Sequence, residues 1–196
     1  MSNKKLAVPD PSAALPEGKS RNAAATREAI LAAARNHFLQ DGYDNTGLRA
    51  IAGDAGIDAA LISRYFGSKK QLFAEVLEST RDESINSFIG EKSTCGRRIA
   101  DKILGPSSTT ANKMVFIGLV TNSNRSPEAS SLVHKHIEKY FMTPFAEWLG
   151  GPDAKDTAWL MASMLMGVVI MNTIKSDKNN CVDRLAVMLQ AIIDSA

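Results

Sequence analysis

The helical spacing of apolar residues is the feature that most constrains the fold of this chain. Apolar side chains recur at helical intervals in nearly every segment, and no stretch keeps the strict alternation that a half-buried strand requires. Breaks between the segments fall at glycine and proline, as in Gly105-Pro106 and Gly150-Gly151-Pro152. The sequence therefore predicts an all-α protein.

Capping residues divide the first 80 residues into short helices. We expect Thr26 to cap a first helix that ends at about Gln40, because Gly42 can adopt the left-handed backbone that terminates a helix. Thr46 is then expected to cap a helix over 48–55, and Asp58 to cap a helix over 59–65.

A fourth helix follows Gly67, where Ser68 and Gln71 fit a capping box, and it is expected to run into the 80s. Pro144 should interrupt one of the later helices. These later helices are expected at 96–104, 110–123, 127–148, 154–174 and 180–194.

The segment from Leu48 to Tyr65 has the pattern of a helix-turn-helix. Two short helices that cross closely need a small residue at the crossing, which Ala52 supplies, and Gly56 supplies a positive φ in the turn. The second helix of such a pair can enter the major groove of DNA. The apolar residues expected to form its small core are Leu48, Ile51, Ala55, Ile57 and Ile62.

The residues from Thr26 through Leu77 resemble the N-terminal domain of TetR-family transcriptional regulators. This resemblance implies a homodimer that inserts one helix per subunit into each half of a near-palindromic DNA operator. It further implies a variable helical C-terminal domain with a small-molecule pocket, whose occupation releases the DNA. The residues that carry it are Gly42-Tyr43, Thr46, Ile51-Ala52, Ala55-Gly56-Ile57, Tyr65-Phe66, Ser68-Lys69 and Leu72-Phe73.

The expected DNA contacts lie on the two short helices and at the start of the fourth. Arg49 can bind a base edge or a phosphate, since arginine suits bidentate contact with guanine. Small side chains at Ala59 and Ala60 would let the backbone approach the groove. Tyr65 resembles the phosphate-contacting tyrosine of the family. The full predicted set is Thr46, Arg49, Ala59, Ala60, Ser63, Arg64, Tyr65 and Lys69.

The net charge of +2 argues against a histone-like protein that coats nucleic acid through bulk charge. Residues 1–70 carry 10 basic and 7 acidic side chains, whereas residues 71–196 carry 13 and 14. A few well-placed basic side chains must therefore share the phosphate contacts with backbone amides and hydroxyls. We expect the affinity for non-specific DNA to be weak.

The apolar pattern of the C-terminal helices predicts a dimer interface. The run from Ala158 to Ile174 is apolar nearly all round, which indicates burial on more than one side. Two such helices from each subunit would form a four-helix interface, as the resemblance implies. An ordinary intramolecular core is the alternative. The predicted interface residues are Trp159, Ser163, Met166, Gly167, Ile170, Leu185, Leu189 and Ile192.

An effector pocket, if present, is expected between the fourth helix and those at 110–123 and 127–148. Few ionisable groups fall in these apolar stretches, which favours a neutral, apolar ligand. The candidate lining residues are Phe116, Val120, Ile137, Phe141, Phe145 and Trp148, each of which could equally belong to a core.

Three domains follow from these patterns: a disordered tail over 1–20, a DNA-binding domain over 21–67, and an effector-binding and dimerisation domain over 68–196. Cys95 and Cys181 are expected to be reduced thiols, and no metal, cofactor or membrane association is expected. A bacterial cytoplasmic regulator, most simply a repressor, is the favoured function. The alternatives are a constitutive DNA-binding dimer without an effector and a helical enzyme.

Overall fold

The computed structural model describes residues 17–81, 89–105, 110–174 and 181–196, and this part of the chain contains helices and no strand. The prediction of an all-α fold is therefore confirmed. The helices are α1 (Glu17–Gln40), α2 (Gly42–Asn45), α3 (Leu48–Asp54), α4 (Ala59–Phe66), α5 (Lys69–Ser79), α6 (Cys95–Leu104), α7 (Thr110–Ser123), α8 (Pro127–Ile137), α9 (Thr143–Leu149), α10 (Ala154–Ile174) and α11 (Val182–Asp194).

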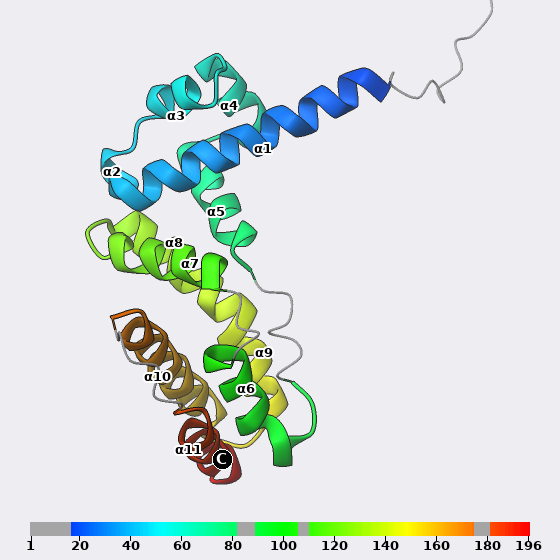
Figure 1. Cartoon of the computed structure of the whole chain (residues 1–196), viewed down its shortest axis with the longest axis vertical. Coiled ribbons are helices and arrows are strands. Elements are labelled where there is room, and N and C mark those ends of the chain that lie inside the picture. Colours follow the sequence, from blue (N-terminus) through cyan, green and yellow to red (C-terminus); the bar gives the residue numbers. More distant parts are fainter. Residues whose placement is uncertain (1–16, 82–88, 106–109, 175–180) are drawn as a thin grey trace, which may run out of the picture.

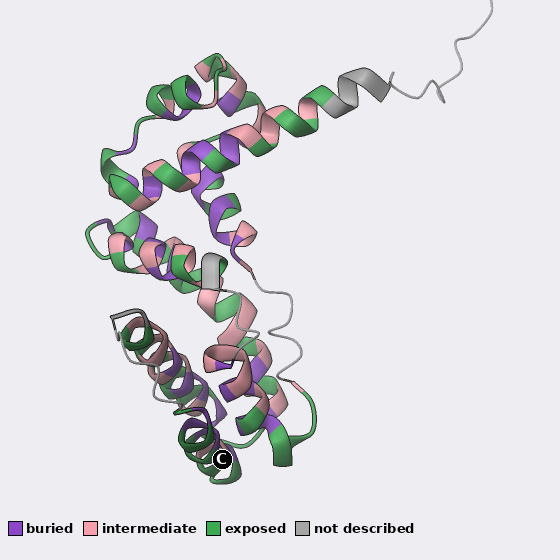
Figure 2. Ribbon diagram, in the orientation of Figure 1, coloured by how far each residue is buried: buried purple, intermediate pink, exposed green. Residues whose placement is uncertain are grey.

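The helices form an elongated arrangement with two distinct ends (Figure 1). The short helices α3 and α4 lie at one end, across the long helix α1, and α10 and α11 lie at the other. Helices α7 and α8 occupy the middle, where they pack against α1 and α5. Figure 2 shows that buried residues run through both halves of the molecule.

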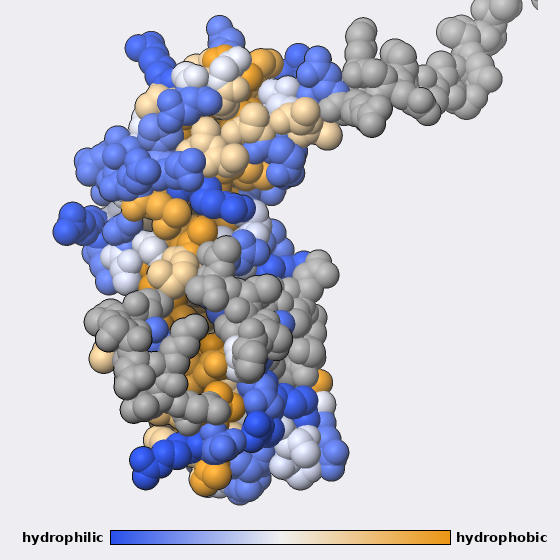
Figure 3. All heavy atoms as spheres, viewed as in Figure 1, coloured by the Kyte–Doolittle hydropathy of each residue, from blue (hydrophilic) through white to orange (hydrophobic). Residues whose placement is uncertain are grey.

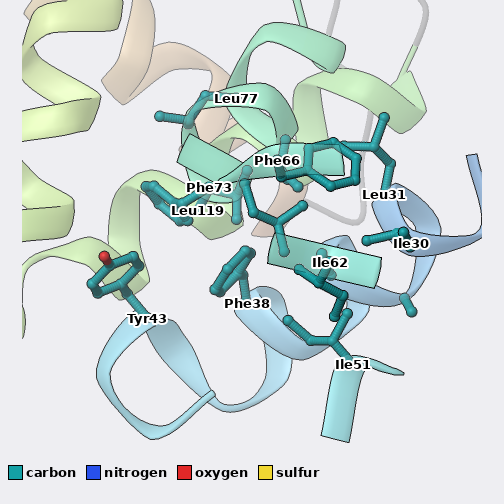
Figure 4. Close-up of a cluster of buried hydrophobic side chains, with 14 of the residues drawn as sticks. Ile30, Leu31, Phe38, Tyr43, Ile51, Ile62, Phe66, Phe73, Leu77 and Leu119 are labelled. Atoms are coloured by element: carbon teal, nitrogen blue, oxygen red, sulfur yellow. The ribbon is translucent and has the colours of Figure 1, made fainter. Parts of the chain in front are cut away.

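Each half of the molecule has its own cluster of buried apolar side chains. The first joins α1–α5 to α7 and α8, and the rings of Phe38, Tyr43 and Phe73 meet at its centre with centroids 5.0–5.9 Å apart (Figure 4). The second cluster joins α6, α9, α10 and α11. The first cluster therefore crosses the sequence boundary placed at Gly67, because α5 packs with the helix-turn-helix as well as with α8.

The predicted positive φ is confirmed at Gly42 and Gly56, which have φ values of 75° and 66°. Gly67, which ends α4, also has a positive φ of 77°, in the region that glycine adopts without a steric cost. Asp58 caps α4 by accepting a hydrogen bond from the amide of Ala60 at 2.7 Å. Ser68 caps α5 by accepting one from the amide of Gln71 at 3.2 Å.

Two of the predicted caps are wrong. Helix α1 begins at Glu17 and not at Thr26, whose hydroxyl donates to the carbonyl of Asn22, 2.8 Å away, within the helix. Thr46 is buried and its hydroxyl donates to the carbonyl of Gly42 at 2.6 Å, so that Gly47 occupies the N-cap position of α3.

The ends of two other segments also differ from the prediction. Helix α5 ends at Ser79, so the expected extension into the 80s is wrong. Residues 1–16 of the expected disordered tail lie outside the described residues, and residues 17–20 form the first turn of α1.

The segment predicted as one helix over 127–148 is interrupted, as Pro144 suggested. Helix α8 passes into a π-helical stretch, Glu138–Met142, and α9 then begins at Thr143 with Pro144 in its first turn. Each π turn takes one residue more than an α turn, so this stretch shifts the register of the apolar stripe that follows it.

Helix α10 is less buried than its sequence suggested. Among the described residues it contains the one segment, Ala154–Asn172, that is long and apolar enough to cross a bilayer. Ala158 and Met161 on one side lie in the second cluster, whereas Trp159 and Leu160 are more than half exposed. The expectation of burial on more than one side is therefore wrong within a single copy of the chain.

Candidate nucleic-acid interface and effector cavity

The outer surface of the helix-turn-helix is polar and accessible. Ile62 and Phe66 anchor α4 in the first cluster, and this fixes the opposite face of the helix toward solvent. Ala60, Ser63 and Arg64 lie on that exposed face, and Arg49 is exposed on α3. The arrangement places two guanidinium groups and small side chains on one short, rigid unit, which suits contact with a DNA groove.

The other predicted DNA contacts are less accessible. Ala59 and Tyr65 are half-buried and pack against the first cluster. The Nζ atom of Lys69 donates to the carbonyl of Asp44 at 3.2 Å and lies 4.6 Å from the centre of the Tyr43 ring. Burial lowers the pKa of Lys69. Phosphate contacts by Lys69 and by the Thr46 hydroxyl stay predictions, and each now requires the side chain to leave a partner within the protein.

A cavity of about 360 Å³ lies between the two clusters, within the size range of small-molecule sites. Helices α6, α7, α8 and α10, the π stretch and the two residues that follow α5 all contribute to its wall. Four of the six predicted effector residues line it: Phe116, Val120, Ile137 and Phe141.

The other two predicted effector residues lie elsewhere, and the structure corrects them. Phe145 is buried in the second cluster. The indole Nε1 of Trp148 donates to the carbonyl of Gly90 at 3.0 Å, and the ring packs against Phe145. The π stretch explains the difference, because the change in register turns these later residues of the stripe away from the cavity.

The predicted dimer residues separate into three groups. Leu185 and Leu189 are buried within the chain against α6, so their assignment to an interface is wrong. Trp159, Ser163 and Met166 line the cavity, and each is also at least partly exposed to solvent. The remaining predicted residues, Gly167, Ile170 and Ile192, are exposed or half-buried on α10 and α11.

Helices α10 and α11 nevertheless present exposed apolar side chains at the end of the molecule far from α4. Leu160, Met171, Val187 and Met188 are each more than half exposed. The space-filling view shows apolar surface among hydrophilic side chains in this half of the molecule (Figure 3). Val187 and Met188 were missed because the stripe selected on α11 is the one that faces α6.

Two sequence profiles match the chain and together cover most of it. The profile of bacterial regulatory proteins of the tetR family matches residues 30–76, and that of the tetracyclin repressor-like C-terminal domain matches residues 93–193. The chain belongs to the TetR family. It is a DNA-binding transcriptional regulator, with the helix-turn-helix at α3 and α4.

Solved structures of TetR-type regulators share the fold. A TetR-family regulator from Streptomyces coelicolor is 27% identical, with 87% of this chain and 96% of that one covered and a TM-score of 0.56. NalD, the secondary repressor of the MexAB-OprM multidrug efflux pump in Pseudomonas aeruginosa, is 17% identical, with 86% and 95% covered and a TM-score of 0.66.

A transcriptional regulator from Saccharomonospora viridis, crystallised in complex with choline, is 19% identical, with 87% and 96% covered and a TM-score of 0.56. At these identities NalD and the Saccharomonospora protein support the fold alone. The search of curated proteins returned no match.

The DNA-binding half of this TetR-family regulator is tied to the middle helices by polar contacts that the sequence did not reveal. The amide of Asn122 on α7 donates to the carbonyl of Leu39 at 2.6 Å. Tyr43 donates through its hydroxyl to the carboxylate of Glu128 on α8 at 3.0 Å, and burial raises the pKa of this phenol above its usual range. These partners are more than 80 residues apart in sequence, so local patterns carry no signal for them.

His37 joins α1 to α3 through two carboxylates. Its Nδ1 lies 3.0 Å from Asp41 and its Nε2 lies 2.8 Å from Asp54. The hydrogen bond with Asp41 raises the pKa of His37 above its ordinary value of 6.5 despite partial burial, and Asp54 contributes in the same direction. The charged imidazolium therefore stabilises the folded helix-turn-helix.

This raised pKa predicts a pH-dependent stability. The contribution of His37 is fully present below the unfolded-state pKa and is lost as the pH rises through the folded-state pKa. The free energy of unfolding should therefore fall between about pH 6 and about pH 8. A His37→Asn variant should lack this part of the dependence in urea titrations at both pH values. An identical pH profile for the two proteins would contradict the role of His37.

Proposed function

We propose that this regulator binds a near-palindromic operator as a homodimer, represses the adjacent genes, and releases the DNA when a small molecule fills its cavity. The observation that carries the proposal is the exposed face of α4, which lies at the opposite end of the molecule from the apolar surface of α10 and α11. Two copies joined through that apolar surface would present their α4 helices to the same side of a DNA duplex.

The homodimer is supported by the exposed apolar side chains of α10 and α11. A stable soluble monomer rarely exposes a group of large apolar residues, so a surface of this kind marks an association site. Light scattering on the full chain should give twice the monomer mass of 21.1 kDa. A monomeric mass at micromolar concentration would contradict the dimer.

The proposed DNA contacts comprise base contacts by Arg49 and by the small residues of α4, together with phosphate contacts. The exposed guanidinium groups of Arg49 and Arg64 are the accessible cations of the two helices. Ala59, Ala60 and Ser63 permit a close approach to the groove, and Thr46, Tyr65 and Lys69 lie near the expected path of the backbone.

Helix α7 supports a link between the cavity and the DNA-binding end. Phe116 and Val120 line the cavity, whereas Leu119 on the same helix is buried in the first cluster. A ligand that displaces α7 would therefore act on α1 and α2, which both contact this helix. The Saccharomonospora regulator was crystallised in complex with choline, so a regulator of this fold can bind a small molecule.

Operator binding is tested with Arg49→Ala. Loss of a bidentate contact with guanine should weaken specific binding by about 1–3 kcal/mol in a gel-shift assay with DNA upstream of the gene. Lys155→Ala is the matched control, because it removes an exposed cation at the far end of the molecule and should leave the affinity unchanged. Unchanged binding by Arg49→Ala would refute the role of this residue.

The absence of any specific retardation of that DNA, even in low salt, would overturn the operator proposal as a whole. Effector release is tested by adding small molecules that raise the melting temperature. A ligand that stabilises the protein without affecting the gel shift would favour the constitutive DNA-binding alternative.

A further inference from the structure

Among the described lining residues of the cavity, those that can carry a charge at neutral pH are all basic. The described lining residues include several basic groups and no carboxylate, and most of the other lining is aliphatic or aromatic. The basic lining residues are Arg81, Lys102, Lys113, His134 and His136. A desolvated cation would find no counter-charge among these residues, whereas an anion would be attracted from several helices.

His136 occupies a special position among these groups. It is half-buried, and its ring lies 5.8 Å from that of Phe116 and 4.8 Å from that of Tyr140. Within the described part of the chain, neither of its ring nitrogens has a hydrogen-bond partner. By contrast, Arg81 forms an ion pair with Glu78 at 3.1 Å, and Lys113 donates to the carbonyl of Lys102. His136 therefore holds unused hydrogen-bonding capacity beside an apolar cavity.

We infer that the cavity binds an amphipathic anion. The apolar part of this ligand, aliphatic or aromatic, packs against α7 and α10, and its acidic headgroup accepts a hydrogen bond from His136. This assignment rests on the proposed role of the cavity as an effector site. It replaces the neutral, apolar effector that the sequence alone favoured. The sequence alone did not reveal the charge of the cavity, because the basic residues come from separate segments and meet only in the folded chain.

Binding of an anion should change the protonation of His136. Burial lowers the pKa of His136 in the empty cavity, with Glu78 opposing the shift and Arg81 and Lys139 adding to it. Lys113 of α7 and Lys102 of α6 line the same space, and Tyr140 faces the ring from the π stretch. A bound anion stabilises the imidazolium, so binding takes up a proton, and the affinity falls as the pH rises through the pKa of the complex.

The experiment uses two fluorescent probes that differ in charge, anilinonaphthalene sulfonate and its uncharged analogue N-phenylnaphthylamine. The full-length regulator should bind the sulfonate more tightly, and the preference should decline with rising pH. His136→Gln should weaken sulfonate binding by roughly tenfold or more, the loss expected for one hydrogen bond to a charged group, while the uncharged probe is unaffected. Lys135→Gln is the matched control, because Lys135 is an exposed basic residue next to His136 on α8 and does not line the cavity.

Calorimetric titration in buffers of different ionisation enthalpy measures the proton uptake directly. Tighter binding of the uncharged probe, or sulfonate binding without proton uptake, would overturn the anionic assignment while leaving the effector site intact. Ala162→Phe fills the cavity and should abolish the binding of both probes. If neither probe binds the wild-type protein, or if both bind this variant normally, the cavity is not the site and the effector proposal itself fails.

Discussion

Replacing Phe73 by alanine is expected to lower the free energy of unfolding by about 3–5 kcal/mol, the range for truncation of a buried aromatic ring. Phe73 is 1% exposed, and its ring makes edge contacts with Phe38 of α1 and Tyr43 of α2 at 5.0 and 5.1 Å. The cavity left behind would adjoin helices from both the DNA-binding end and the middle of the molecule, and neither could fill it without losing its other contacts.

Urea denaturation followed by circular dichroism measures this loss, at a fixed protein concentration because dimerisation would contribute to stability. Met114→Ala is the control, since Met114 on α7 is 41% exposed and its truncation should change stability by less than about 1 kcal/mol. Equal losses for the two variants would show that the ring cluster does not hold the first half of the molecule together.

Substituting Gly96 by alanine is expected to destabilise the second cluster by about 3 kcal/mol, the upper end of the range for overpacking. A Cβ atom at this position would lie 2.5 Å from the carbonyl oxygen of Ala186 and 2.6 Å from the amide nitrogen of Gln190. Both atoms belong to the backbone of α11, so helices α6 and α11 would have to separate along their contact. The hydrogen bond from the amide of Gly96 to the Gln190 side chain, 3.0 Å long, would be lost as well.

Gly118→Ala is the matched control for this prediction. Its Cβ would lie 2.6 Å from Cδ2 of Leu39, which is the far end of a flexible side chain and can move. Alanine also favours the helical state over glycine by up to about 1 kcal/mol, so this variant should be nearly neutral. The denaturation midpoints of the two variants measure how much stability each substitution loses. A Gly96→Ala protein as stable as the wild type would contradict the close approach of α6 and α11.

Local structure in the DNA-binding half could be predicted from sequence because short-range chemistry decides it. The helix bounds of α3 and α4, the positive φ at Gly56 and the cap at Asp58 depend on neighbouring residues alone. The errors at Thr26 and Thr46 have a related cause. A threonine hydroxyl can also donate to a carbonyl four residues earlier, and sequence does not decide between the two bonds.

The candidate cavity was only partly predictable. Phe116, Val120, Ile137 and Phe141 were recognised as apolar residues of neighbouring helices, but the same pattern also selected Phe145, which lies in a core. The basic lining residues gave no signal, because a lone Lys102 or His136 in a helical sequence is indistinguishable from a solvent-exposed polar residue. Only the folded chain brings them to one surface.

The sequence by itself determined that this chain is helical, where its short helices begin and turn, and which family it resembles. The tertiary structure alone decided which face of each helix meets which neighbour. Helix α11 illustrates the reason: Leu185 and Leu189 turn inward against α6, while Val187 and Met188, equally apolar, face outward. Helical periodicity identifies an apolar stripe, but the choice between stripes is made by the close approach at Gly96, which involves residues 90 positions away.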